Sequence, residues 1–246
     1  MKKFIYPLYV LLIALTVATQ VRASDASMGA ETKAAPYFDP ATVNLKIIMA
    51  DPPANGSAAT LREIKLILEM QQIRTPEQVA RIQREVHLNV DLFDTVFGPW
   101  FKTDSLPATA HLFERVNATE HPIIELGKKF WHRPRPPLQD SRVHPPIDLP
   151  KNDSYPSGHS TVGTLDALIL AQLAPDLEGV LLERGDQIGQ DRIIAGVHFP
   201  SDVGAGKMLG YALFFKLMVM PEFTADLDKA KAEIAAARAS ANGSKP

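Results

Sequence analysis

Eight residues in three short stretches have the side chains and spacing that phosphoryl chemistry needs. In chain order they are Lys128 and Arg135, then Ser157, Gly158 and His159, and finally Arg192, His198 and Asp202. The first two flank the run KFWHRP, the second group follows a proline, and the third is spaced six and four residues apart. Cations, a glycine-containing turn and two histidines together can bind an anion and move a proton.

The three cations in this set can neutralise a doubly charged phosphate group. Lys128 provides a point charge, whereas Arg135 and Arg192 provide planar forks that hold two oxygens at once. Ser157 and Gly158 lie where an apolar helix begins. We therefore expect free backbone N–H groups and the positive end of that helix to point at the same anion. Glycine lets this backbone approach closely.

The two histidines differ in their sequence neighbours. Asp202 follows His198 by four residues, in the first turn of a helix that Pro200 or Ser201 opens, and its side chain leans back toward the helix start. A hydrogen bond from one ring nitrogen to this carboxylate fixes the tautomer and leaves the other nitrogen free to attack phosphorus. His159 has no such neighbour, so it better fits the acid that protonates a departing alkoxide.

The elements that position these residues are predicted to be helices, because no segment alternates like a strand. The segment 75–97 has the clearest pattern: Thr75 can cap it, Pro76 takes the first helical position, and Gln78 completes a capping box. The other helical segments are 60–73, 107–118, 121–131, 160–173 and 201–220. A long proline-rich loop covers 132–156. The sequence therefore predicts an all-α, single-domain helical bundle.

The first 23 residues have the layout of a secretory signal peptide. Two lysines precede an apolar stretch, and the small residues that follow predict cleavage after Ala23 or Ala26. The alternative is an uncleaved membrane anchor, for which the apolar stretch is short. Removal of residues 1–23 takes away three basic and no acidic residues, so the formal charge changes from −2 to −5. A mildly acidic protein has no global attraction for nucleic acid or anionic lipid. We expect neither a nucleic-acid partner nor stable membrane insertion after cleavage.

The rest of the chain divides by composition. The predicted segments are the signal peptide at 1–23, an N-terminal extension at 24–44, the helical domain at 45–222, and a charged, alanine-rich C-terminal tail at 223–246. Lys207 and Lys216 interrupt the most apolar segment, 201–220. We therefore expect this segment to form a buried helix and not a membrane span. The chain has no cysteine, so disulfides cannot hold the domain together.

The three clusters together resemble the signature of the type 2 phosphatidic acid phosphatase and vanadium haloperoxidase superfamily. The pattern is Lys-x6-Arg-Pro, then Pro-Ser-Gly-His, then Arg-x5-His-x3-Asp. Within that superfamily the chain most resembles the bacterial class A non-specific acid phosphatases. The resemblance includes SYPSGH at 154–159, DPPANGSAATLREI and FGPWFKTDSLPA, and it extends from about residue 45 to 220.

The resemblance implies a metal-free mechanism through a phosphohistidine. His198 would be the nucleophile with Asp202 as its partner, and His159 the general acid. The five residues expected to bind phosphate are Lys128, Arg135, Ser157, Gly158 and Arg192. Two positions depart from the family pattern: Asp191 replaces the usual serine, and Asp153 replaces the usual glycine. The carboxylate of Asp191 either pairs with Arg192 and weakens phosphate binding, or points away.

The leading hypothesis is a secreted phosphomonoesterase of broad specificity in a bacterial periplasm. Its partners would be small phosphate monoesters, and the hypothesis allows a homo-oligomer. No cofactor is expected, although vanadate could occupy the phosphate site. One alternative is a vanadium-dependent haloperoxidase that uses the same pocket for vanadate. The other is a phosphate-binding module without turnover. A zinc site is not expected, because the remaining histidines lack ligand spacing.

Overall fold

The computed structural model describes residues 34–243 of the 246-residue chain. The predicted signal peptide, residues 1–23, lies outside the described residues, as does the first part of the predicted extension. Every regular element within the described range is an α-helix or a short 3-10 helix, which confirms the prediction of an all-α fold.

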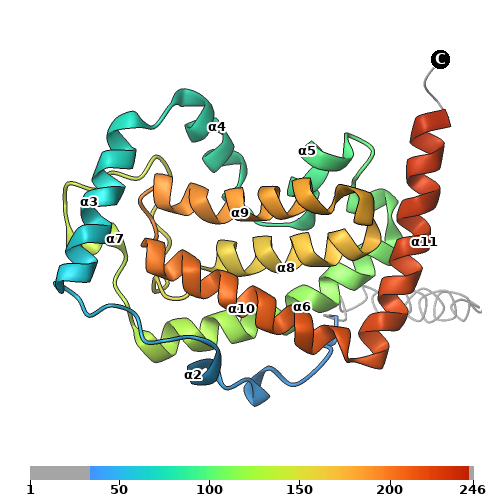
Figure 1. Ribbon diagram of the computed structural model, residues 1–246, viewed down its shortest axis with the longest axis horizontal. Coiled ribbons are helices and arrows are strands. Elements are labelled where there is room, and N and C mark those ends of the chain that lie inside the picture. Colours follow the sequence, from blue (N-terminus) through green and yellow to red (C-terminus); the bar gives the residue numbers. More distant parts are fainter. Residues whose placement is uncertain (1–33, 244–246) are drawn as a thin grey trace, which may run out of the picture. The chain divides into compact units, whose positions relative to one another are not determined.

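Helix α8, Gly158–Leu173, is the central element (Figure 1). It packs along α9, Glu178–Ile194, on one side and along α10, Pro200–Met218, on the other. Helix α6, Pro107–Trp131, also packs against α8, and α11, Pro221–Gly243, contacts both α6 and α8. The other α-helices are α2 (Leu45–Ile48), α3 (Ala58–Ile73), α4 (Pro76–Arg84), α5 (Asp94–Phe97) and α7 (Pro136–Gln139).

Glycine permits the close approach of α8 to its two neighbours. A Cβ atom added at Gly185 of α9 would collide with the carbonyl oxygen of Gly163, and one at Gly206 of α10 with the carbonyl oxygen of Ser157. The second crossing places the start of α8 against the second turn of α10, and the backbone N–H of Ser157 donates to the carbonyl oxygen of Asp202 in the first turn of α10. Two of the predicted clusters lie at these helix starts, so the packing of the bundle brings them to one place.

The predicted helix over 75–97 is wrong beyond residue 84. Its start is confirmed, since Thr75 and Gln78 form the predicted capping box at the beginning of α4. The helix ends at Arg84, and the chain becomes helical again only in a 3-10 turn from Val90 and in α5. The capping residue Glu85 explains the break, because its carboxylate and its carbonyl oxygen are bound by residues of α8 and α9. Tertiary hydrogen bonds therefore override the local helical pattern.

Two further helices differ from the predicted segments. The segments 107–118 and 121–131 form one helix, α6, which continues through Pro122. Helix α9 was not among the predicted helices. Its buried face carries Arg184, Asp191 and Arg192 beside glycines, so its sequence has no clear apolar stripe.

The C-terminal tail is helical, as its alanine-rich, charged composition predicts, but it is not separate from the core. Residues 223–243 belong to α11, and Phe223, Leu227, Ala230 and Ile234 are buried in the main core. The steps of three and four residues between them form one apolar face, which the charged residues around them obscure in the sequence. Arg115 of α6 binds Asp226 of α11 at 3.0 Å. The segment is thus part of the helical domain.

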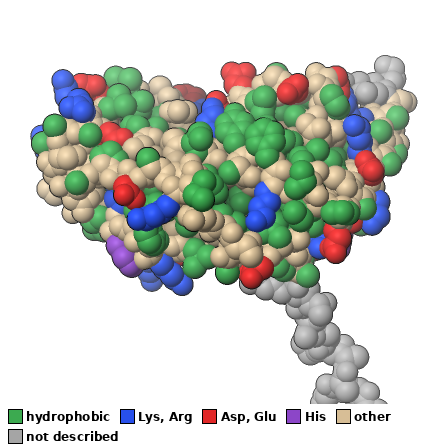
Figure 2. Space-filling view, turned by 60° about the horizontal axis from the view of Figure 1, so that its bottom comes forward, with side chains coloured by type: hydrophobic (Ala, Val, Ile, Leu, Met, Phe, Trp, Pro, Cys, Tyr) green, Lys and Arg blue, Asp and Glu red, His purple; other side chains and the backbone are tan. Residues whose placement is uncertain are grey.

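Among the described residues, no single helix has both the length and the hydropathy of a membrane span. Helices α10 and α11 meet these two criteria only when taken together, as a pair bent by 95°. The face in Figure 2 carries basic and acidic side chains dispersed among apolar ones. The buried residues of α10 include Leu209, Leu213 and Leu217, which agrees with the predicted buried helix.

Candidate active site

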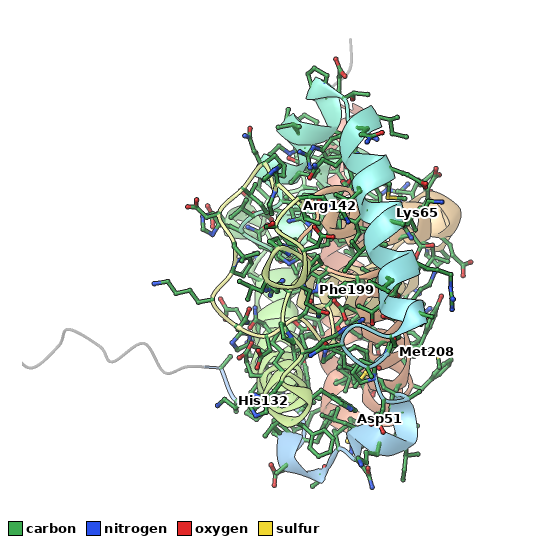
Figure 3. All side chains as sticks on the ribbon, turned by 90° about the vertical axis from the view of Figure 1, so that its left-hand side faces the viewer. Asp51, Lys65, His132, Arg142, Phe199 and Met208 are labelled. Carbon is green, nitrogen blue, oxygen red and sulfur yellow. The ribbon has the colours of Figure 1, made fainter. Side chains whose placement is uncertain are left out.

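A cavity of about 290 Å³ lies where the first turn of α8, the end of α9 and the end of α6 meet the loop that follows α6. Six of the eight predicted site residues line it: Lys128, Arg135, Gly158, His159, Arg192 and His198. Asp202 and Ser157 lie behind its wall and are completely buried. Figure 3 views the molecule from this end, with Phe199 labelled near its centre, one residue after His198.

His198 lies in the short turn between α9 and α10, where Gly196 has a φ of 74°, a conformation that favours glycine. Its Nε2 atom lies 3.0 Å from an η nitrogen of Arg135, and its Nδ1 atom lies 3.4 Å from Oδ2 of Asp202. An arginine nitrogen only donates, so Nε2 accepts and Nδ1 carries the proton. Burial, followed by the charge of Arg135, lowers the pKa of His198 well below its usual value.

Asp202 is held by several donors besides His198. Its Oδ2 atom accepts hydrogen bonds from the backbone N–H of Phe199 at 2.8 Å and from the hydroxyl of Ser154 at 2.5 Å. Its Oδ1 atom accepts from Arg133 at 2.6 Å. Burial raises the pKa of Asp202, and the charge of Arg133 acts in the opposite direction. The carboxylate is therefore fixed in position before any ligand binds.

A further carboxylate supports Arg133 from α3. Glu63 accepts from Arg133 at 3.0 Å and from the backbone N–H of Ser201, in the first turn of α10, at 2.7 Å. The guanidinium of Arg133 also lies 4.0 Å from the ring centre of Phe199. Sequence reasoning did not assign a role to Ser154 or Glu63, and it left Arg133 either at the substrate entrance or in packing without predicting its contact with Asp202. For Ser154 and Arg133 the available signal was their place inside two of the motifs.

The cations Lys128 and Arg135 are held by the loop before α8. Lys128 donates to the carbonyl oxygen of Asp153 at 2.7 Å. Arg135 donates to the carbonyl oxygens of Asn152 and Val197 at 2.9 and 2.8 Å, and to the side-chain oxygen of Asn152 at 2.8 Å. Burial lowers the pKa of Lys128 to about 8 and that of Arg135 to about 10. Both side chains are therefore charged in acidic and neutral solution.

His159 is held by a neutral group. Its Nε2 atom lies 2.8 Å from the carbonyl oxygen of Glu85, so Nε2 carries a proton and donates. Nδ1 is then the ring nitrogen that can exchange a proton with a ligand. Burial, followed by the charge of Arg192, lowers the pKa of His159 to about 3.

Arg192 is completely buried and paired with Glu85. One of its η nitrogens donates to Glu85 Oε2 at 2.9 Å, while Glu85 Oε1 accepts from Arg184 at 2.7 Å. Asp191 points away from Arg192, since Arg81 binds both of its oxygens at 2.5 and 2.7 Å. Of the two possibilities left open by the sequence, the structure supports the one in which Asp191 does not pair with Arg192.

The start of α8 differs in part from expectation. The hydroxyl of Ser157 caps the helix through the N–H of Ser160, and its own N–H donates to the carbonyl oxygen of Asp202 at 3.0 Å. The backbone N–H of Ser157 is therefore not free for an anion, contrary to the prediction. Gly158 does line the cavity, and the first N–H groups of a helix have no acceptor within it.

The side chain of Asp153 faces His132, with 3.1 Å between Oδ2 and Nδ1. Its carbonyl oxygen alone reaches the cations, so the exchange of the usual glycine for aspartate leaves the cavity lining unchanged. Within residues 34–243, no group of three or more His, Asp or Glu side chains could hold a metal ion.

Comparison with known proteins agrees with this geometry. The family model of the PAP2 superfamily matches residues 116–225, which contain all three motifs. The chain is 32% identical to a protein named acid phosphatase from Zymomonas mobilis, over 96% of this chain and 93% of that protein. It is 42% identical to one named non-specific acid phosphatase from Providencia stuartii, over 76% and 79% of the two chains.

The chain belongs to the PAP2 superfamily, as its three motifs predicted. A crystal structure of a transmembrane PAP2-type phosphatidylglycerolphosphate phosphatase from Bacillus subtilis is also similar, with a TM-score of 0.48 and 21% identity over 70% of this chain and 89% of that one. The predicted likeness to bacterial non-specific acid phosphatases is confirmed by the named relatives.

Proposed function

We propose that this protein is an acid phosphatase that hydrolyses phosphate monoesters through a phosphohistidine on His198. The observation that carries the proposal is the orientation of His198, whose Nδ1 faces Asp202 and whose Nε2 faces the cation-lined cavity. A site that only binds phosphate does not need an oriented imidazole. The names of the relatives that match along most of the chain support the same activity.

In the first step, Nε2 of His198 attacks phosphorus and the bond from phosphorus to the ester oxygen breaks. Lys128, Arg135 and Arg192 neutralise the charge on the transferring group. The leaving oxygen takes a proton from Nδ1 of His159, because Nε2 of this ring is bound to Glu85. Asp202 stabilises the positive charge that the His198 ring acquires when it is phosphorylated.

In the second step, water attacks phosphorus and the bond to His198 breaks. The neutral Nδ1 of His159 accepts a proton from that water, which returns His159 to its acid form. Phosphate then leaves, and His198 is again a neutral imidazole with its proton on Nδ1. No metal ion takes part in this proposed cycle.

The low pKa of His159, about 3, has a direct consequence for this cycle. The ring is neutral in the free protein at most pH values, so its acid form must arise when substrate binds. A phosphate group offsets the charge of Arg192, which is among the causes of the low value. A monoester monoanion also brings a proton of its own, and acidic solution favours that form.

Further features follow from the sequence and the relatives. The predicted signal peptide at 1–23 and the bacterial relatives favour the periplasm. The similarity to the non-specific acid phosphatase of Providencia stuartii favours broad specificity. Vanadate, as a phosphate mimic, should occupy the anion site and inhibit hydrolysis.

The test is phosphate release by the purified protein from aryl, sugar and nucleoside monophosphates, in the presence of EDTA. We expect hydrolysis that survives chelation and is lost in His198→Ala, by on the order of 10⁶-fold if the nucleophile is removed. Asp104→Asn, an exposed substitution far along the chain, is the control. Vanadate-dependent halide oxidation without phosphate release, or appreciable activity of His198→Ala, would contradict the proposal.

A further inference from the structure

The cavity has an apolar wall next to His159. Four residues form it: Val86, Leu88, Ile124 and Val162. Val162 lies one turn after His159 on α8, and Val86 directly follows Glu85, whose carbonyl oxygen holds the His159 ring. Because the leaving oxygen must reach His159, the alcohol attached to it must lie along this wall. An uncharged, apolar alcohol loses water there without leaving a polar group unpaired.

Two acidic residues also line this cavity. Glu125, on α6, is partly buried and accepts a hydrogen bond at 2.9 Å from Asn152, which itself accepts from Arg135 at 2.8 Å. Asp148 is exposed in the loop before α8. Glu125 therefore lies near Arg135, to which Asn152 links it, and Asp148 lines the same cavity. A second phosphate of a bound substrate would meet these negative charges.

We propose that this cavity selects phosphate monoesters with an uncharged, apolar leaving group, such as aryl or alkyl phosphates, and disfavours substrates with a second phosphate. The apolar wall attracts the first class, and Glu125 and Asp148 repel the second. This inference rests on the proposed function and names the substrate class for the same site.

The test uses two compounds that cannot be hydrolysed, phenylphosphonate and methylenediphosphonate, so it does not depend on turnover. Calorimetry on the wild-type protein should show that phenylphosphonate binds about tenfold more tightly than methylenediphosphonate. The double variant Glu125→Gln, Asp148→Asn should bind the diphosphonate about tenfold more tightly than the wild type does, and phenylphosphonate almost as before. Glutamine at 125 keeps an acceptor for Asn152.

The matched control removes two charges elsewhere, with Glu114→Gln on the exposed side of α6 and Asp104→Asn. It should leave both affinities unchanged. Leu88→Ala should weaken phenylphosphonate several-fold and leave inorganic phosphate unaffected.

The inference would be overturned if the ratio of the two affinities were the same in the wild type and in the Glu125→Gln, Asp148→Asn variant. Tighter binding of the diphosphonate than of phenylphosphonate by the wild type would also overturn it. If neither compound binds, both the inference and the assignment of this cavity as an anion site are overturned. Failure of the proposed function has a different signature, because it would appear as turnover that does not depend on His198 while the two affinities still differ.

Discussion

His198 and His159 face one cavity from the starts of different helices, and in each an acceptor oxygen fixes the ring nitrogen that carries the proton. The partner of His198 is the carboxylate of Asp202, whereas the partner of His159 is the neutral carbonyl oxygen of Glu85. A carboxylate stabilises positive charge on an imidazole, while a carbonyl fixes chiefly its tautomer and orientation. The difference suits His198 to carry a phosphoryl group and His159 to give up a proton.

The two partners also differ in what holds them. Asp202 is fixed by Arg133, which lies outside the cavity and is supported by Glu63. Glu85 is instead paired with Arg192, a residue of the cavity itself. The orientation of His198 is therefore set without the substrate, but the surroundings of His159 change when an anion reaches Arg192.

The largest effect in this comparison is expected from Asp202→Asn. The amide can donate to Nδ1 of His198, which favours the tautomer with its proton on Nε2 and removes the attacking lone pair. We expect turnover to fall by about 10⁴-fold, as in a catalytic triad with the same change. Steady-state assays with an aryl phosphate measure this effect.

Asp226→Asn is the matched control, since Asp226 is also buried and bound by an arginine, but between α6 and α11. It should keep activity within a few-fold. A loss of less than tenfold in Asp202→Asn would mean that the carboxylate does not set the tautomer of His198.

His159→Asn tests the other half of the comparison. An alkoxide needs a proton to leave, whereas a nitrophenolate leaves nearly unaided. Turnover of an alkyl phosphate should therefore fall about 10–100-fold further than turnover of p-nitrophenyl phosphate. Equal losses for both substrates would make His159 a ligand or a structural residue and would remove the division of labour.

The decline of kcat/KM at alkaline pH tests the cations and not the histidines. Burial lowers the pKa of Lys128 to about 8, so this lysine is charged below that pH and loses its proton above it. Since the neutral amine no longer attracts phosphate, kcat/KM should fall about tenfold per pH unit above about pH 8. In Lys128→Arg the alkaline decline should move upward. An unchanged decline in that variant would assign it to another group.

The smallest effect on activity is expected for Asp166, two turns beyond His159 on α8. Unlike Asp202, it is buried with another carboxylic acid, Glu120, as its electrostatic neighbour. Burial raises the pKa of Asp166 from 3.8 to about 8. The folded pKa is above the unfolded value, so this group stabilises the fold fully below about pH 4 and loses that contribution as pH rises to about 8.

Asp166→Asn should leave kcat within about twofold and raise the free energy of unfolding at pH 9 by about 1–2 kcal/mol relative to wild type. Urea unfolding at pH 5 and pH 9 measures the difference. Loss of stability of the same size at both pH values would contradict the interpretation.

The comparison also shows which parts of the site the sequence could predict. The two histidines, their cations and Asp202 lie at ends of helices, where local patterns of proline, glycine and apolar residues are informative. Glu85 was not predicted to take part, because its partners Arg184 and Arg192 are 99 and 107 residues away. The prediction of one long helix over 75–97 was wrong beyond residue 84 for the same reason.

The backbone N–H of Ser157 shows the same limit. A local pattern predicted it to be free at a helix start, but α10 provides an acceptor through the carbonyl oxygen of Asp202, 45 residues along the chain. The role of α11 was also hidden, because its four buried apolar residues gain their partners only when α6 is folded beside it. Partners distant in sequence set these features.

The most direct test of the account is to trap the covalent intermediate in His159→Asn. A good leaving group, such as p-nitrophenolate, still departs in the first step, but no base then activates water in the second. Rapid quenching at high pH followed by mass spectrometry of peptides should find a phosphoryl group on His198, in an amount that approaches one per active site, and none in His198→Ala. Phosphate release without any phosphorylated His198, or phosphorylation of a different residue, would contradict the central claim.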